Sequence, residues 1–200
     1  MPDLDSGYLD PFYSEKTYCL HCNVVEPESG KLYGRDPRST AVKAEEYLKK
    51  TKIGTKAFFG PEAEFFLFDD VKFSNSMNKV SFEVDAVDAS WNTDTSYEMG
   101  NMGHRPGVKG GYFPVNPTDA GQDIRSEMLS TMKRMGMKVD KHHHEVASCQ
   151  HELGLVFDSL KTQGDNLQKY KYVIQNVAHS YGKSATFMPK PVANDNGTGM

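Results

Sequence analysis

Residues 57–68 of this chain read AFFGPEAEFFLF. Successive side chains of a β-strand point to opposite faces, so a strand here would place Glu62 and Glu64 on the same face, roughly 7 Å apart. Burial and mutual repulsion both oppose the ionisation of two such carboxylates. A hard divalent cation, Mg²⁺ or Mn²⁺, takes oxygen ligands, so the stretch predicts a metal site. The alternative is a strand whose second face simply contacts water.

The composition is that of a folded protein with one domain, or one domain and part of another. The 200 residues are 38% hydrophobic and 11% aromatic, which is enough to build a core. A net charge of −4 and a pI near 6.0 argue against nucleic-acid binding. No apolar run is long enough to cross a membrane, and the acidic start is no signal peptide. We therefore expect a cytoplasmic protein without a membrane or nucleic-acid partner.

The three cysteines are too few, and odd in number, for a disulfide framework. Cys19 and Cys22 have the C-x-x-C spacing of zinc and redox motifs, but they lie in a strand-like run, residues 17–25. Residues three apart in a strand face opposite sides. We therefore interpret both cysteines as structural.

The order of predicted elements favours an α+β fold. Capping signals predict helices from Asp36 to about Lys50, from Asp119 to Gly136 and from Asp165 to Gly182. Alternation predicts strands near residues 62–68, 80–84, 138–147 and 185–188, and residues 88–118 resemble a functional loop. The expected inward positions are Ala41, Ala44, Tyr47 and Leu48 in the first helix and Ile124, Met128, Met132 and Met135 in the second. The strand at 80–84 rests on the apolar–polar alternation at Val80, Phe82 and Val84. Residues 1–35 are too few for a domain, and the chain stops in a turn-forming run, so we expect a piece of a longer protein.

A second group of candidate ligands lies in residues 142–152, which read HHHEVASCQHE. Alternation places His142 and His144 on one face and His143 and Glu145 on the other. The four side chains are therefore not expected to form one zinc site, and we interpret the histidines as packed or exposed.

The stretch after Glu145 is long enough to turn back and bring Glu152 beside it. Adding Glu64 predicts three carboxylates around one ion and leaves Glu62 for a second. Such oxygen ligands suit Mg²⁺ or Mn²⁺ better than Zn²⁺, and paired ions of this kind hold polyphosphates during phosphoryl transfer. No Walker-type phosphate loop is present.

Several segments come in the order in which a known family has them: GPEAEF (60–65), NMGHRP (101–106), KGGYF (109–113), HHHEVA (142–147) and NGTGM (196–200). Together they resemble bacterial type I glutamine synthetase, and the resemblance covers essentially the whole chain. It implies a curved antiparallel sheet backed by helices. Residues 1–35 would be the C-terminal remnant of a small N-terminal β-grasp-like domain, and 36–200 the N-terminal half of the catalytic domain.

The resemblance also implies roles for individual residues. Glu64, Glu145 and Glu152 would ligate a first divalent ion, and Glu62 would contribute to a second, giving two or more ions per site. Asn196 and Gly197 would contact the substrate glutamate. The residues near the nucleotide would be Asp140, which stands where the family often has a glutamate, and Phe157.

The implied reaction is the ATP-dependent ligation of ammonia to L-glutamate through a γ-glutamyl phosphate. The implied assembly is a homo-oligomer of double hexameric rings with sites between subunits. Because further family residues would lie beyond Met200, we expect the isolated chain to be inactive. Two alternatives stay open: a related ligase that uses a polyamine or aromatic amine, and a non-catalytic relative with the same fold.

Overall fold

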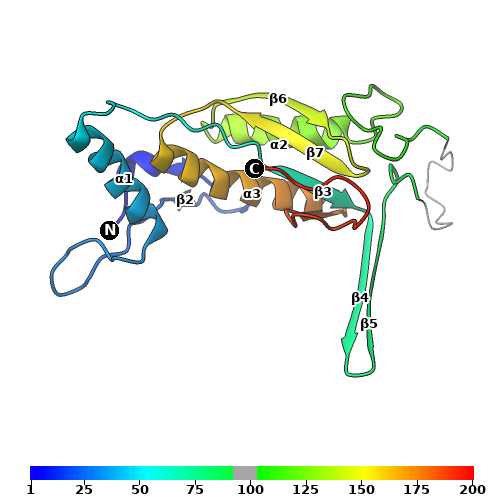
Figure 1. Ribbon diagram of the computed structural model, residues 1–200, viewed down its shortest axis with the longest axis horizontal. Helices are drawn as coiled ribbons and strands as arrows, with labels where there is room; N and C mark the ends of the chain where they lie inside the picture. The colour runs from blue at the N-terminus through cyan, green and yellow to red at the C-terminus, as the bar shows by residue number, and fades with distance from the viewer. Residues whose placement is uncertain (92–102) are drawn as a thin grey trace.

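The protein is an antiparallel sheet with helices on one face. The computed structural model describes residues 1–91 and 103–200. The main sheet has the strand order β6-β7-β3-β8, and every neighbouring pair is antiparallel (Figure 1). Its strands are β3 (Glu64–Phe68), β6 (Val139–His144), β7 (Gln150–Leu155) and β8 (Ser184–Thr186). Two helices, α2 (Gln122–Arg134) and α3 (Leu160–Ser180), pack against it, which confirms the predicted α+β class.

The two faces of the sheet differ because side chains alternate along β3. Phe65 and Leu67 point toward α2 and α3 and join the main core. The predicted methionine stripe of α2 is confirmed, because Ile124, Met128, Met132 and Met135 are all buried in that core. Glu64 and Phe66 point the other way, and Phe66 packs in a smaller cluster. The helix-free face of the sheet is therefore available for a polar site.

The remaining elements are smaller. They are η1 (Leu4–Ser6), the antiparallel pair β1 (Tyr8–Leu9) and β2 (Tyr18–Cys19), α1 (Pro37–Thr51), and the hairpin of β4 (Asp70–Ser76) and β5 (Lys79–Asp85). The hairpin projects away from the body (Figure 1). No described helix combines the length and the apolar character that crossing a membrane requires.

Two predicted helix starts are wrong, because arginines engage the carboxylates that were expected to cap them. The second helix begins at Gln122 and not at Asp119, whose carboxylate pairs with Arg125. The third begins at Leu160 and not at Asp165, whose carboxylate binds Arg38. The predicted ends are confirmed, since Gly136 and Gly182 follow with the positive φ values of 81° and 69° that favour glycine.

The first helix is confirmed at its start, where Asp36 accepts a hydrogen bond from the Ser39 backbone. Its inward face is partly wrong, because Ala44 and Tyr47 are exposed while Glu45 is half-buried. The reason is polar: Glu45 Oε1 accepts a hydrogen bond from the Lys161 backbone nitrogen, 2.8 Å away, in the first turn of α3.

Two predicted strands also differ from the structure. The alternating apolar residues Val80 and Phe82 are exposed, because among the described strands β5 pairs only with β4. The run 17–25 contains one short strand with isolated bridges, and neither Cys19 nor Cys22 belongs to a potential metal-ligand group among the described residues.

Arg38 joins the N-terminal segment to the body. Its guanidinium donates to Asp165 at 2.8 Å, to Asp3 at 2.5 Å and to Asn23 at 2.5 Å. Only 11% of the Arg38 side chain is exposed. The guanidinium lowers the pKa of Asp3 below its usual 3.8, so the stability from this pair is present above about pH 4 and is lost as the pH falls.

We predict that Arg38→Ala destabilises the protein by about 3 kcal/mol, because it leaves two largely buried carboxylates without their main partner. Urea denaturation at pH 7 measures this loss, and the difference from wild type should shrink below pH 4. Arg35→Ala, at an exposed neighbouring position, is the control and should stay within about 0.5 kcal/mol of wild type. Equal effects of the two substitutions would contradict this role of Arg38.

Candidate active site

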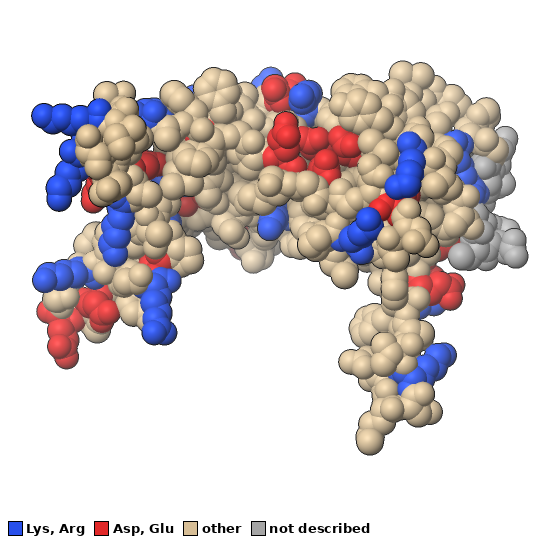
Figure 2. Space-filling model, viewed as in Figure 1, with Lys and Arg blue, Asp and Glu red and all other residues tan. Residues whose placement is uncertain are grey.

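Strand register brings the predicted carboxylates together on the helix-free face. In the antiparallel sheet the Cα of Glu64 on β3 lies opposite Glu152 on β7, and Glu152 lies opposite His143 on β6. Directly opposed residues point to the same side of a sheet. Three neighbouring strands therefore each present one polar side chain to the same place, and Figure 2 shows acidic side chains gathered over this part of the body.

Glu145 joins the group through the turn that follows β6. Its backbone nitrogen donates to the Gln150 carbonyl at 2.7 Å, so the chain reverses here and leads into β7. This confirms that the stretch between Glu145 and Glu152 folds back. The ligand atoms of His143, Glu145 and Glu152 all lie within 4.8 Å of one another, and all three residues are buried.

His143 bridges the two carboxylates, and sequence reasoning missed it. Its Nδ1 is 3.3 Å from Glu145 Oε1, and its Nε2 is 3.4 Å from Glu152 Oε2. The signal was present, because alternation put His143 on the Glu145 face. The histidine was set aside because two neighbours in the run point the other way.

The electrostatics of the group favour a cation. Burial first, and then repulsion from other carboxylates, raises the pKa of Glu64, and Glu152 and Glu62 both contribute to that repulsion. The pKa values of Glu145 and Glu152 are likewise raised, in each case chiefly by burial. A divalent ion would offset both the repulsion between these carboxylates and the cost of burying their charge. Three carboxylates with one imidazole form an oxygen-rich donor set that suits Mg²⁺ or Mn²⁺.

Glu62 and the two predicted nucleotide residues line one cavity beside this group. Glu62 is exposed and lies just before β3. The cavity, of about 230 Å³, is lined by Glu62, Glu152, Asp140, Phe157 and Gly154, among others. A Cβ at Gly154 would meet the Asp140 carboxylate, so any side chain at this position would displace Asp140 from its present place.

The predicted glutamate-contacting turn lies against one of these carboxylates, Glu64. The Gly199 nitrogen donates to Glu64 Oε2 at 2.6 Å, and Lys109 Nζ donates to the Asn196 side chain at 2.9 Å. A Cβ at Gly197 would lie only 2.5 Å from the Pro189 carbonyl oxygen. Gly197 therefore has a structural reason to lack a side chain, besides the predicted contact with substrate.

The KGGYF segment, residues 109–113, covers the group from one side. The Phe113 ring stacks on His143 with centroids 4.4 Å apart and an interplanar angle of 18°. A Cβ at Gly111 would lie 2.4 Å from the Glu145 carbonyl oxygen, so only glycine allows this approach. In the neighbouring NMGHRP segment, Asn101 and Met102 lie outside the described residues.

The opposite face of β6 carries a different buried group, Asp88, His144 and His151. His144 Nδ1 contacts the Glu145 carbonyl at 2.6 Å, and Nε2 contacts Asp88 at 2.8 Å. Burial alone would lower the pKa of His144, but the bond to Asp88 outweighs it and the pKa is raised. Both ring nitrogens of His144 lie within hydrogen-bond distance of an oxygen atom of the protein, so both are already engaged. This group holds the Glu145 backbone in place through the hydrogen bond between His144 and the Glu145 carbonyl.

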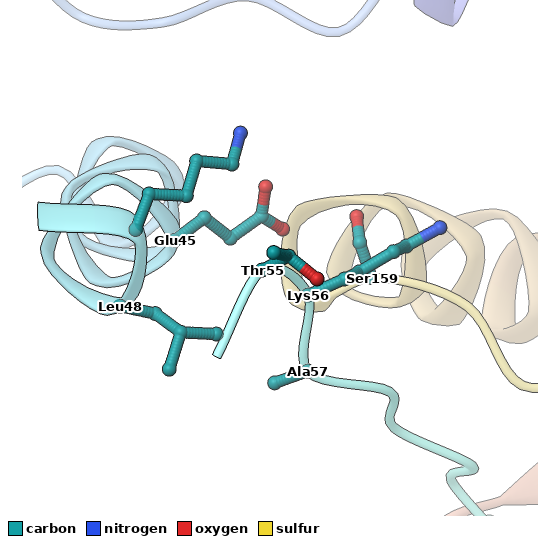
Figure 3. A pocket seen from close by; sticks show the side chains of 7 residues that line it. Glu45, Leu48, Thr55, Lys56, Ala57 and Ser159 are labelled. Atoms are coloured by element: carbon teal, nitrogen blue, oxygen red, sulfur yellow. The ribbon is translucent and has the colours of Figure 1, made fainter. Parts of the chain in front are cut away.

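A further cavity, of about 210 Å³, lies between α1 and the start of α3 (Figure 3). Glu45 reaches from α1 toward Ser159, and Lys56 pairs with Asp158 at 3.1 Å. None of the four predicted metal ligands lines this cavity. It lies where the two helices pack against each other.

Comparison with known proteins agrees with this geometry. The family described as "Glutamine synthetase, catalytic domain" matches residues 34–200. The chain is 66% identical, over its whole length, to proteins named glutamine synthetase in Cereibacter sphaeroides and Rhodobacter capsulatus. It spans 43% and 45% of their lengths.

The fold agrees as well. A cryo-electron microscopy structure of Plasmodium falciparum glutamine synthetase superposes with a TM-score of 0.87 at 29% identity, covering 97% of this chain and 38% of that one. The family match, the identity to bacterial relatives and this superposition all agree: the chain belongs to the glutamine synthetase catalytic-domain family.

Proposed function

We propose that this chain supplies the metal and nucleotide part of an ATP-dependent glutamate–ammonia ligase. The observation that carries the proposal is the convergence of Glu64, Glu145 and Glu152 on one face of the sheet. Glu152 also borders a cavity that Glu62, Asp140 and Phe157 line. The 66% identity to proteins named glutamine synthetase supports ammonia, and not a polyamine or aromatic amine, as the acceptor.

In this proposal Glu64, Glu145 and Glu152 hold one Mg²⁺ or Mn²⁺, and Glu62 contributes to a second. The fit rests on the raised pKa values of the three carboxylates, of which Glu145 and Glu152 are buried and Glu64 is half-buried, and on their oxygen-rich donor set. When bound, such ions neutralise charge on the phosphate oxygens of ATP. His143 contacts Glu145 and Glu152 and would keep both carboxylates turned toward the ion.

The substrates would meet at the edge of this group. Phe157 offers an exposed ring at the cavity that Asp140 lines, which suits an adenine nucleotide, while Asn196 and Gly197 would contact L-glutamate. A γ-carboxylate oxygen of glutamate attacks the γ-phosphorus as its bond to ADP breaks. Ammonia then attacks the acyl carbon and phosphate leaves. The residues of this chain contribute positioning and a fixed charge environment.

The proposal includes a homo-oligomer of double hexameric rings in the cytoplasm. The β4–β5 hairpin supports assembly, because Phe73, opposite Phe82, is 81% exposed on an element that projects from the body. Residues 1–35 would belong to a small N-terminal domain. The start of the family match at residue 34 supports that boundary.

We predict that Glu152→Gln in the full-length enzyme weakens Mn²⁺ binding at least tenfold, because a neutral amide replaces a charged ligand. Formation of γ-glutamyl hydroxamate from ATP, glutamate and hydroxylamine should fall by at least about 100-fold. Equilibrium dialysis measures the first quantity and the colorimetric assay the second.

Glu46→Gln is the matched control for this prediction, because it removes the same charge at an exposed position on α1. It should change neither quantity by more than about twofold. Unchanged Mn²⁺ affinity in Glu152→Gln would contradict the proposal that Glu152 ligates a divalent ion. If the wild-type enzyme prefers methylamine or putrescine to ammonia, the proposal that ammonia is the acceptor is wrong.

We further predict a pH-dependent stability difference between wild type and Glu152→Gln. A raised pKa means that the Glu152 carboxyl binds its proton more tightly in the folded state than in the unfolded chain. Its stabilising contribution is complete below about pH 4.5 and is lost as the pH rises through the folded pKa. Without divalent ions, wild type should therefore lose more thermal stability than the variant between pH 5 and pH 7.5.

Saturating Mn²⁺ should reverse that trend, because the ion binds the deprotonated carboxylate and stabilises wild type more at high pH. Differential scanning fluorimetry of both proteins tests the pH trend in EDTA and its reversal in Mn²⁺. A stability difference that does not depend on pH in EDTA would contradict this account of Glu152.

A further inference from the structure

Gln150 lies between the carboxylate group and the turn of residues 196–199. It lies on β7 opposite Phe66 and is only 1% exposed. Its Nε2 donates to Glu64 Oε2 at 2.7 Å and to the Gly197 carbonyl at 3.0 Å. Its Oε1 accepts from the Ala147 nitrogen at 3.1 Å. Both amide hydrogens and the amide oxygen are therefore committed.

The partners of Gln150 belong to two different parts of the site. Glu64 is a predicted metal ligand, and its Oε2 accepts hydrogen bonds from Gln150 and from the Gly199 nitrogen. Among the described residues no group donates to Glu64 Oε1, so that oxygen is the one left for a cation. Gly197 lies in the turn that was predicted to contact glutamate.

That turn is tied to the preceding segment at Pro189. The Thr198 nitrogen donates to the Pro189 carbonyl at 2.7 Å, and the same oxygen leaves no room for a Cβ at Gly197. The peptide group between Gly197 and Thr198 is therefore held on both sides, its carbonyl by Gln150 and its N–H by Pro189.

We propose that Gln150 is a positioning residue that couples divalent-metal binding at Glu64 to L-glutamate binding at the turn 196–199. The inference rests on the proposed function. Glu64 would hold the ion through Oε1, and ligation there would restrict rotation of the carboxylate and hence the direction of Oε2. Because the Gln150 amide is planar, its second N–H then holds the Gly197 carbonyl in one place. The two sites share a coupling free energy, which acts equally in both directions.

Only an amide satisfies this arrangement. A glutamate at 150 would place an oxygen where Nε2 now meets Glu64, and an apolar residue would supply neither donor. Glutamine has two donors and one acceptor on a single rigid group, which matches its three partners.

The test is the effect of saturating L-glutamate on the Mn²⁺ dissociation constant of the full-length enzyme, measured from the electron paramagnetic resonance signal of free Mn²⁺. In wild type we expect glutamate to tighten Mn²⁺ binding at least about fivefold. In Gln150→Met, and also in Gln150→Glu, which keeps the acceptor for Ala147, the effect should shrink at least threefold, by the loss of that coupling. The KM for glutamate should rise about fivefold or more, and the KM for ATP should stay within about twofold.

Gln163→Met is the matched control. Gln163 is also buried, and its Nε2 donates to the Val156 carbonyl at 2.6 Å, but it contacts neither Glu64 nor Gly197. It should cost stability and leave the effect of glutamate on Mn²⁺ unchanged. If Gln163→Met reduces the effect of glutamate on Mn²⁺ affinity as much as the Gln150 variants do, then the loss of any buried amide has this consequence. The proposed role of Gln150 would then be wrong.

A measurement on wild type alone guards against variants that fail to fold. Mn²⁺ without glutamate should slow hydrogen exchange in a peptide that covers residues 189–200. Unchanged exchange there, or unchanged coupling in folded Gln150 variants, overturns the inference. The proposed function is tested separately, by whether wild type forms glutamine or γ-glutamyl hydroxamate, and neither result on Gln150 decides it.

Discussion

The antiparallel register of β6, β7 and β3 is the constraint on which the site depends. It sets Glu64 opposite Glu152 and Glu152 opposite His143, so three strands each contribute one group to the helix-free face. A slip of one residue in β7 would turn Glu152 into the core and bring His151 out beside Glu64. The apolar alternation that buries Phe65 against the helices is therefore also what places the carboxylates.

The helices were predictable where local signals decide the structure and unpredictable where distant partners do. Glycines ended α2 and α3 as expected, since the backbone there needs a positive φ. Their starts were misassigned because Asp119 and Asp165 engage Arg125 and Arg38, and Arg38 is 127 residues from its partner. A capping box in the sequence does not reveal that a carboxylate already has a stronger, charged partner.

The site divides in the same way. Alternation and turn length were enough to bring Glu64, Glu145 and Glu152 together, because a strand fixes which face a side chain takes. Alternation placed His143 on the Glu145 face, but spacing does not reveal that His143 and Gln150 each contact two partners from different segments. Such bridging residues are where sequence patterns carry least information, and they hold the carboxylates in position.

The central claim is that the three carboxylates share a divalent ion. Anomalous diffraction from crystals of the full-length enzyme soaked in Mn²⁺ tests it most directly. The account predicts an anomalous peak within about 2.5 Å of carboxylate oxygens from Glu64, Glu145 and Glu152 together. A site that holds Mn²⁺ elsewhere, while His143 still bridges Glu145 and Glu152 with no ion beside them, would contradict it.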